Sequence, residues 1–267
     1  MISRYGSPKR KSRRCSQLIV CTIGIFFVTS SISCESAHAP SNEAIAQYDL
    51  GVQQRDADDP DGAIAHYTSA IDLHPDYALA YCGRGVAKRD KGNHAAAIKD
   101  FDKAIGLAPD LSDAYYERGS ARSDTGDYEG AISDLNVAIR LNPRDFEAYN
   151  NRAGAKHHSG DLEGAVADYT LSIDVNPTYA IAYNNRGLVK EKIGDLDGAI
   201  EDYSKAIELN SSFGKAYSNR GLARVKKGQY MEAAADCELA LKHDPDRSDS
   251  LEMRAFIKEH LSRESKY

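Results

Sequence analysis

Apolar and polar positions alternate along most of this chain with the spacing of amphipathic helices, and the pattern returns every 34 residues. The pattern shared by the copies is Tyr-x-x-Arg-Gly, then Gly-Asp, then Ala-Ile-x-Asp-Tyr, then Ala-Ile-x-Leu-x-Pro, with local departures in individual copies. A fixed period of this length predicts a repeat architecture. The copies align without insertion or deletion, the first being the most divergent, and they are 44–77, 78–111, 112–145, 146–179, 180–213 and 214–247.

Each copy predicts two helices joined by a tight turn. A glycine that can adopt positive φ ends the first helix, as Gly160 does in the fourth copy. An aspartate or asparagine then caps the second helix, and a proline closes the unit. In the fifth copy Ser211 replaces that proline, which predicts a looser turn before the sixth.

A single helical pair cannot bury its apolar face, whereas stacked neighbours can. The expected fold class is therefore all-α, an α-solenoid of helix-turn-helix repeats over residues 44–247 with a concave and a convex side. Residues 248–267 supply Leu251, Phe256 and Ile257 among charges, and they predict a C-terminal capping helix and tail.

The repeated positions identify a family resemblance. In the second copy they are Tyr81, Gly85, Ala97, Phe101, Ala104 and Pro109, at positions 4, 8, 20, 24, 27 and 32. This pattern resembles the tetratricopeptide repeat. The resemblance implies a stack of helical pairs whose concave groove holds an extended peptide or a partner helix.

Residues 1–39 have the pattern of an export signal. Six basic residues and one acid precede or flank an apolar run from Leu18 to Val28, and Ala37-His38-Ala39 follows with peptidase-type spacing. The run is short for a membrane span, which needs about 20 residues. We therefore expect secretion to the periplasm or outside the cell, with cleavage after Ala39 or Ser33. An uncleaved membrane anchor and a lipidated Cys34 are the alternatives.

The charge and the cysteine content disfavour some kinds of partner and site. The formal net charge is −6, and with the basic leader removed the rest is more acidic still, which disfavours nucleic acid as a partner. Outside the leader only Cys82 and Cys237 remain, in distant repeats, so neither a disulfide nor a metal site is predicted. We expect no cofactor.

Arginine at position 7 and aspartate at position 23 occur together in five copies and are both missing from the first. This covariation predicts structural ion pairs, either between the two helices of one repeat or from each aspartate to the next repeat's arginine. In the second scheme Asp236 would pair with Arg254. The within-repeat pairs would be Arg84 with Asp100, Arg118 with Asp134, Arg152 with Asp168, Arg186 with Asp202 and Arg220 with Asp236.

Three successive asparagines at position 6, Asn151, Asn185 and Asn219, form a ladder that resembles the asparagine ladder in the tetratricopeptide arm of the O-linked N-acetylglucosamine transferase. Amides both donate and accept hydrogen bonds, which suits a peptide backbone. We expect the ladder to face the groove. The same peptide-binding surface is predicted to include Asn150, Asn184, Tyr116, Leu188 and Lys192.

A clamp for a C-terminal carboxylate is excluded, because no unit combines a basic residue at position 5 with asparagine at position 9. No phosphate-binding glycine loop, nucleophile elbow or metal-spaced histidine pair is present either. The predicted function is a non-catalytic scaffold that binds a protein or peptide partner in its groove. The alternative is a structural subunit of a cell-envelope assembly that acts by self-association or through its convex face. The sequence leaves the oligomeric state open.

Overall fold

The computed structural model describes residues 39–264, which form thirteen α-helices and no strand. Apart from Ala39, the predicted leader lies outside these residues, so cleavage, anchoring and lipidation of Cys34 stay predictions. The chain divides into two compact units, one ending at Asp127 and the other beginning at Tyr128. Each unit has its own clusters of buried apolar side chains.

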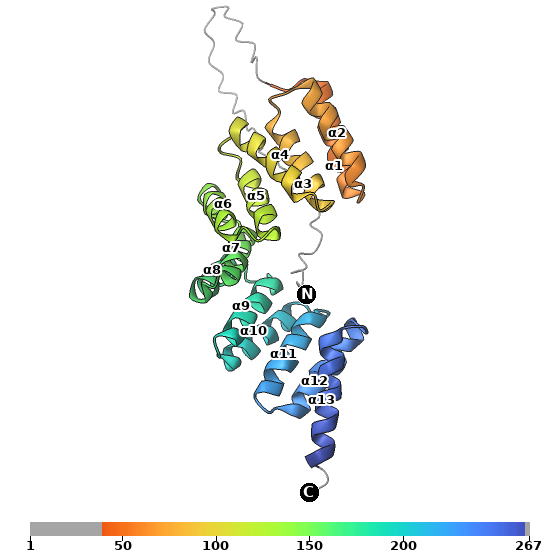
Figure 1. Ribbon diagram of the computed structural model, residues 1–267, viewed down its shortest axis with the longest axis vertical. Coiled ribbons are helices and arrows are strands. Elements are labelled where there is room, and N and C mark those ends of the chain that lie inside the picture. Colours follow the sequence, from red (N-terminus) through yellow and green to blue (C-terminus); the bar gives the residue numbers. More distant parts are fainter. Residues whose placement is uncertain (1–38, 265–267) are drawn as a thin grey trace, which may run out of the picture. The chain divides into compact units, whose positions relative to one another are not determined.

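The first unit holds two helical pairs and one further helix (Figure 1). In each pair the first helix packs along the second. The helices are α1 (Asn42–Asp56), α2 (Pro60–Leu73), α3 (Ala78–Asp90), α4 (His94–Leu107) and α5 (Ser112–Asp124).

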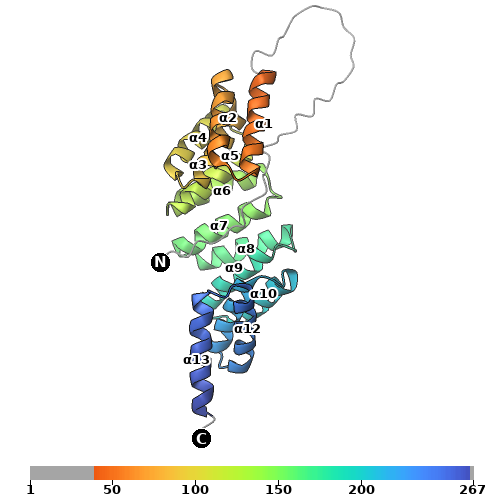
Figure 2. The ribbon, with the colours of Figure 1, turned by 90° about the vertical axis from the view of Figure 1, so that its right-hand side faces the viewer.

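The second unit begins with a helix that packs against the first of three helical pairs, and it ends with a long helix beside α12 (Figure 2). Its helices are α6 (Tyr128–Leu141), α7 (Phe146–Ser159), α8 (Leu162–Val175), α9 (Ala180–Lys192), α10 (Leu196–Leu209), α11 (Gly214–Lys226), α12 (Tyr230–His243) and α13 (Ser248–Glu264).

The turns inside the pairs have the chemistry that the sequence predicts. The five glycines that follow first helices all have positive φ, between 74° and 95°. Side chains of Asn93, Asp161 and Asp195 then accept a hydrogen bond from a backbone N–H in the first turn of α4, α8 and α10. These local signals fix where each helix ends and the next begins.

The predicted looser turn at Ser211 is not observed. The backbone N–H of Phe213 donates to the carbonyl of Asn210 at 3.0 Å, and in the preceding repeat Tyr179 donates to Asn176 at 3.1 Å. In both turns the asparagine side chain also accepts a hydrogen bond from a backbone N–H two residues later. This asparagine turn holds the backbone without the help of proline.

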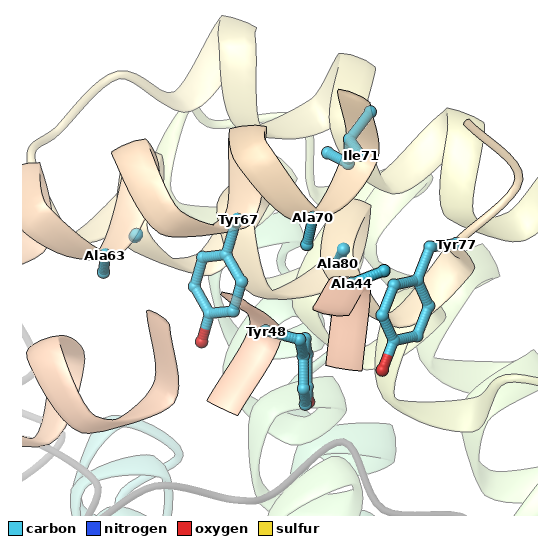
Figure 3. Close-up of a cluster of buried hydrophobic side chains, with 9 residues drawn as sticks. Ala44, Tyr48, Ala63, Tyr67, Ala70, Ile71, Tyr77 and Ala80 are labelled. Atoms are coloured by element: carbon cyan, nitrogen blue, oxygen red, sulfur yellow. The ribbon is translucent and has the colours of Figure 1, made fainter. Parts of the chain in front are cut away.

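Alanines and aromatic rings fill the interior. In the first unit the ring of Tyr48 lies 5.5 Å from that of Tyr67 and 5.4 Å from that of Tyr77, measured between centroids. Figure 3 shows these rings beside alanines such as Ala44 and Ala70, which have no exposed surface. Small residues let the helices approach closely while the rings fill the space between them.

Within each unit, successive first helices contact one another, whereas successive second helices of the described residues do not. Each stack therefore curves with its first helices on the inside. We call this the inner side and the side of the second helices the outer side. The all-α fold class with stacked helical pairs is confirmed.

Candidate functional site

Asparagine side chains on the inner side of the second unit form a chain of hydrogen bonds that joins successive repeats. Asn185 Nδ2 donates to Asn150 Oδ1 at 3.2 Å, and Asn219 Nδ2 donates to Asn184 Oδ1 at 2.8 Å. Within one helix, Asn184 also donates to Asn185 at 3.3 Å. The amide at position 6 of a repeat thus bonds the amide at position 5 of the repeat before it. We call this set the amide chain.

The predicted outward orientation of these amides is wrong for most of the set. Asn184 is 1% exposed, and Asn150, Asn185 and Asn219 are 7–8% exposed, because the next first helix covers position 5 and the amide chain ties up position 6. Tyr116, at position 5 of its own repeat, is also buried. A ligand cannot use these groups as a continuous ladder without breaking the contacts between repeats.

Three of the predicted binding residues do remain accessible. Asn151 and Leu188 are partly exposed, and Lys192 is exposed at the end of α9. The peptide-binding role predicted for them stays a prediction.

The arginines at position 7 contact the aspartates of their own repeats. Arg84 Nε and Nη2 donate to the two carboxylate oxygens of Asp100, both at 2.9 Å. The same two-point contact joins Arg152 to Asp168, Arg186 to Asp202 and Arg220 to Asp236. Arg118 and Asp134 lie in different compact units, and their pairing stays a prediction.

Where the structure describes them, the aspartates at position 23 do not pair with the arginine of the next repeat. Asp236 forms ion pairs with Arg220 at 2.6 Å and with Arg224 at 2.7 Å, and not with Arg254. The link to the neighbouring repeat comes from the arginine's third nitrogen instead. Arg186 Nη1 donates to Thr170 of the preceding repeat at 3.0 Å, and Arg220 Nη1 donates to Ser204 at 3.0 Å.

The pKa values of Arg84 and Arg186 are raised above their ordinary value. Burial opposes the charge of Arg186, but its hydrogen bond to Asp202 and that carboxylate's charge raise its pKa. Arg186 also lies 5.7 Å from the ring centroid of Tyr183. Because their donors are engaged inside the stack, the arginines at position 7 do not form an anion-binding surface.

Two histidines end the first helix of the fourth repeat. His158 stacks on Tyr128 with ring centroids 5.1 Å apart, and His157 stacks on His158 at 5.4 Å. Burial, with Lys192 and His158 nearby, lowers the pKa of His157 to about 4. His157 is therefore neutral at physiological pH.

A pocket of about 390 Å³ lies on the inner side between α11 and α13. Leu222, Val225, Met253 and Phe256 supply its apolar wall, and Asp249 and Glu252 supply its acidic rim. It forms because position 6, an asparagine in the preceding repeats, is Met253 in α13, so the amide chain does not continue there. This pocket is not among the sites predicted from the sequence, although the change from Asn219 to Met253 at position 6 marks it.

Other kinds of site find little support in residues 39–264. No group of three or more His, Cys, Asp or Glu residues there could hold a metal ion. Cys82 and Cys237 are buried and are not joined in a disulfide. No helix among these residues has the length and apolar content to span a bilayer.

Sequence profiles of the tetratricopeptide repeat match residues 48–112, 116–180, 180–213 and 214–247. The chain belongs to the tetratricopeptide repeat family. Proteins of this family generally act as non-catalytic scaffolds for protein–protein interaction.

Solved structures of several tetratricopeptide proteins are similar to this chain. The type IV pilus biogenesis factor PilW has a TM-score of 0.73 at 15% identity over 79% of this chain and 98% of its own. A chain of the APC/C hetero-tetramer Cut9–Hcn1 has a TM-score of 0.71 at 17% identity over 80% of this chain, which spans only 42% of that chain. MamA has a TM-score of 0.56 at 30% identity over 61% of this chain and 96% of its own. Curated proteins gave no significant match.

Proposed function

We propose that this tetratricopeptide protein is a non-catalytic scaffold that binds an extended peptide or a partner helix along its inner side. The pocket between α11 and α13 carries the proposal. Its volume of about 390 Å³ is within the range of pockets that bind ligands, and its wall is apolar. Phe256 is 49% exposed there, so an apolar surface is available without unfolding any element.

The rim of the pocket suggests the chemistry of the bound segment. Asp249 accepts a hydrogen bond from the backbone N–H of Ser250 and lies 3.5 Å from Arg247, so its charge is partly balanced. Glu252 is exposed and forms no ion pair with any described residue. A segment that inserts an apolar side chain and places a Lys or Arg beside it would satisfy both features.

The remaining accessible residues extend this surface along the second unit. Leu188 lies at position 9 of its repeat, the position that Leu222 and Phe256 occupy in the pocket. Asn151 and Lys192 offer polar contacts in the preceding repeats. The buried asparagines hold successive first helices at a fixed spacing, and so position this surface rather than contact the ligand.

A second candidate function is a structural subunit that acts through its outer side. Leu171 and Val175 on α8 are 42% and 38% exposed, and Leu239 on α12 is 37% exposed. Exposed apolar side chains on second helices can form a surface for self-association. In either case the leader pattern of residues 1–39 supports export to the periplasm or the cell exterior.

Selection from a random peptide library displayed on phage tests the proposal. The full chain should enrich peptides with an apolar residue next to Lys or Arg, and the Glu252→Lys variant should enrich Asp or Glu at that place. If the Glu252→Lys variant enriches the same peptides as the wild type, the acidic rim does not select the bound segment. The proposal of a peptide-binding scaffold is not contradicted by that result. No enrichment by either protein contradicts peptide binding itself.

A further inference from the structure

Helix α13 occupies the place of a first helix, and no second helix among residues 39–264 packs on it as α12 packs on α11. Ser250, Met253 and Ile257 are at most 4% exposed and face the sixth repeat, and α13 contacts both α11 and α12. It is the last helix of the described residues. Counting from Ser248 as position 1 places α13 in the same register as the first helices of the repeats.

The face that a first helix turns toward its second helix is therefore open on α13. In the repeats, positions 4, 7, 8 and 11 form that face, with tyrosine, arginine, glycine or alanine, and a basic residue. On α13 these positions are Leu251, Arg254, Ala255 and Lys258, and all four are exposed. We call these four residues the open face.

The sixth repeat shows what this arrangement of basic residues binds. Arg220 and Arg224, at positions 7 and 11, contact the carboxylate of Asp236 at 2.6 and 2.7 Å. Asp236 comes from α12 and is 1% exposed. Arg152 and Lys156 hold Asp168 of α8 in the same way, at 2.6 and 2.9 Å.

On the open face, the cations at positions 7 and 11 are Arg254 and Lys258, and no carboxylate of the described residues pairs with them. The side chains of Arg254 and Lys258 form no hydrogen bond or ion pair with the residues that the structure describes. Ser204 of α10 accepts a hydrogen bond from Arg220 of the next repeat. The residue at the same position of α12 is Glu238, which is exposed and forms no ion pair with any described residue.

We propose that the open face docks an amphipathic helix of a partner protein that carries a carboxylate for Arg254 and Lys258. The helix would present small and apolar residues around that carboxylate, as α8, α10 and α12 do. Ala255 in place of glycine is compatible with such packing, because Ala153 occupies the same position in the fourth repeat and lies buried with Tyr169. An aromatic residue of the partner could therefore pack there too.

A second copy of the folded chain does not offer the required helix. The aspartates that bind such basic pairs, Asp202 and Asp236, are 4% and 1% exposed and already engaged. The occupant that fits is thus an acidic helix from a different protein. This surface is separate from the inner-side pocket, and its test does not depend on peptide binding there.

A labelled peptide with the sequence of α10, residues 196–209, is the probe. Isolated helices of this length are marginal in water, so a lactam bridge between its Glu201 and Lys205 would hold the helix. Glu201 is exposed and Lys205 partly exposed in α10, so the bridge leaves Asp202 and Tyr203 available. Binding to the full chain is measured by fluorescence anisotropy at low and high salt.

We expect binding that weakens at least ~10-fold in the Arg254→Glu variant, in line with the loss of a charge-assisted contact. Lys99→Glu on α4, an exposed position in the first unit, makes the same charge change and should leave affinity unchanged. The Asp202→Asn peptide should also bind at least ~10-fold more weakly. Absence of binding, equal binding by Arg254→Glu, or equal binding of the Asp202→Asn peptide would each overturn the proposal. Light scattering that shows self-association lost in Arg254→Glu would instead make the open face an interface between copies.

Discussion

Arg186 and Asp202 join the two helices of one repeat through two parallel hydrogen bonds, Nε to Oδ2 at 2.9 Å and Nη2 to Oδ1 at 2.7 Å. Lys190 adds a third contact to the same carboxylate at 2.9 Å. Thr170 of the preceding repeat accepts from the remaining arginine nitrogen, so one side chain ties three helices together. The planar fork of arginine allows this, whereas a lysine ammonium would not reproduce it.

Removing the carboxylate should destabilise the second unit. In Asp168→Ala, the cations of Arg152 and Lys156 lose a partner that is 2% exposed. Loss of one member of a buried pair costs about 3–5 kcal/mol. Urea unfolding followed by circular dichroism measures the change. Asp174→Ala, an exposed position on the same helix, is the control, and an unchanged midpoint for Asp168→Ala would show that the pair contributes nothing to stability.

The amide chain predicts that asparagine substitutions on the inner side affect folding as well as binding. Asn219→Ala leaves the side-chain oxygen of Asn184 without its donor, and a buried polar group without a partner costs about 1–3 kcal/mol. Asn151→Ala, at a partly exposed position, should cost less. Equal unfolding midpoints for both variants and the wild type would contradict the role of the amide chain.

Alanine substitutions at two glycines should differ in their effect on stability. A Cβ on Gly187 would lie 2.7 Å from the Tyr203 ring, and overpacking of this kind costs about 1–3 kcal/mol. At Gly154 the nearest atom would be the Tyr169 hydroxyl at 3.7 Å, an ordinary contact, so alanine there should be neutral or stabilise the helix by up to about 1 kcal/mol. Thermal unfolding of Gly187→Ala and Gly154→Ala compares them directly, and a higher melting temperature for Gly187→Ala would be incompatible with the packing described.

His157 predicts a stability change at acidic pH. Its pKa is lowered from 6.5 to about 4, so the unfolded chain binds a proton more readily than the folded one between these values. The contribution of neutral His157 is complete above pH 6.5 and is lost as the pH falls toward 4. His157→Gln should reduce the fall in unfolding midpoint between pH 7.5 and pH 4.5, whereas His74→Gln in the other unit should not. An identical pH dependence in all three proteins would contradict this.

Much of the architecture could be predicted from the sequence because it rests on local signals. The period, the glycines with positive φ and the capping asparagines and aspartates act within a few residues of themselves. The contact between Arg186 and Asp202 was also predictable, since the two residue types occur and disappear together. The choice between pairing schemes was not, because both satisfy the same covariation.

The candidate site was harder to predict because it depends on how one repeat covers the next. Position 5 looked accessible on a single helix, yet Asn184 is 1% exposed once the following first helix is in place. The asparagines at adjacent positions predict a ligand-facing ladder, whereas in the structure they bond each other. The pocket arises where Met253 ends that pattern, and its shape depends on the packing of α13 against α11.

The central claim is that the partner binds on the inner side and not on the outer side. Calorimetry of a library-selected peptide with two matched variants tests it: Phe256→Ser in the pocket and Leu171→Ser on outer helix α8, at positions 49% and 42% exposed. We predict that Phe256→Ser weakens binding at least ~10-fold, in line with the loss of a buried aromatic contact, while Leu171→Ser leaves it unchanged. Unchanged affinity for Phe256→Ser together with weaker binding by Leu171→Ser would contradict the claim and place the interaction on the outer side.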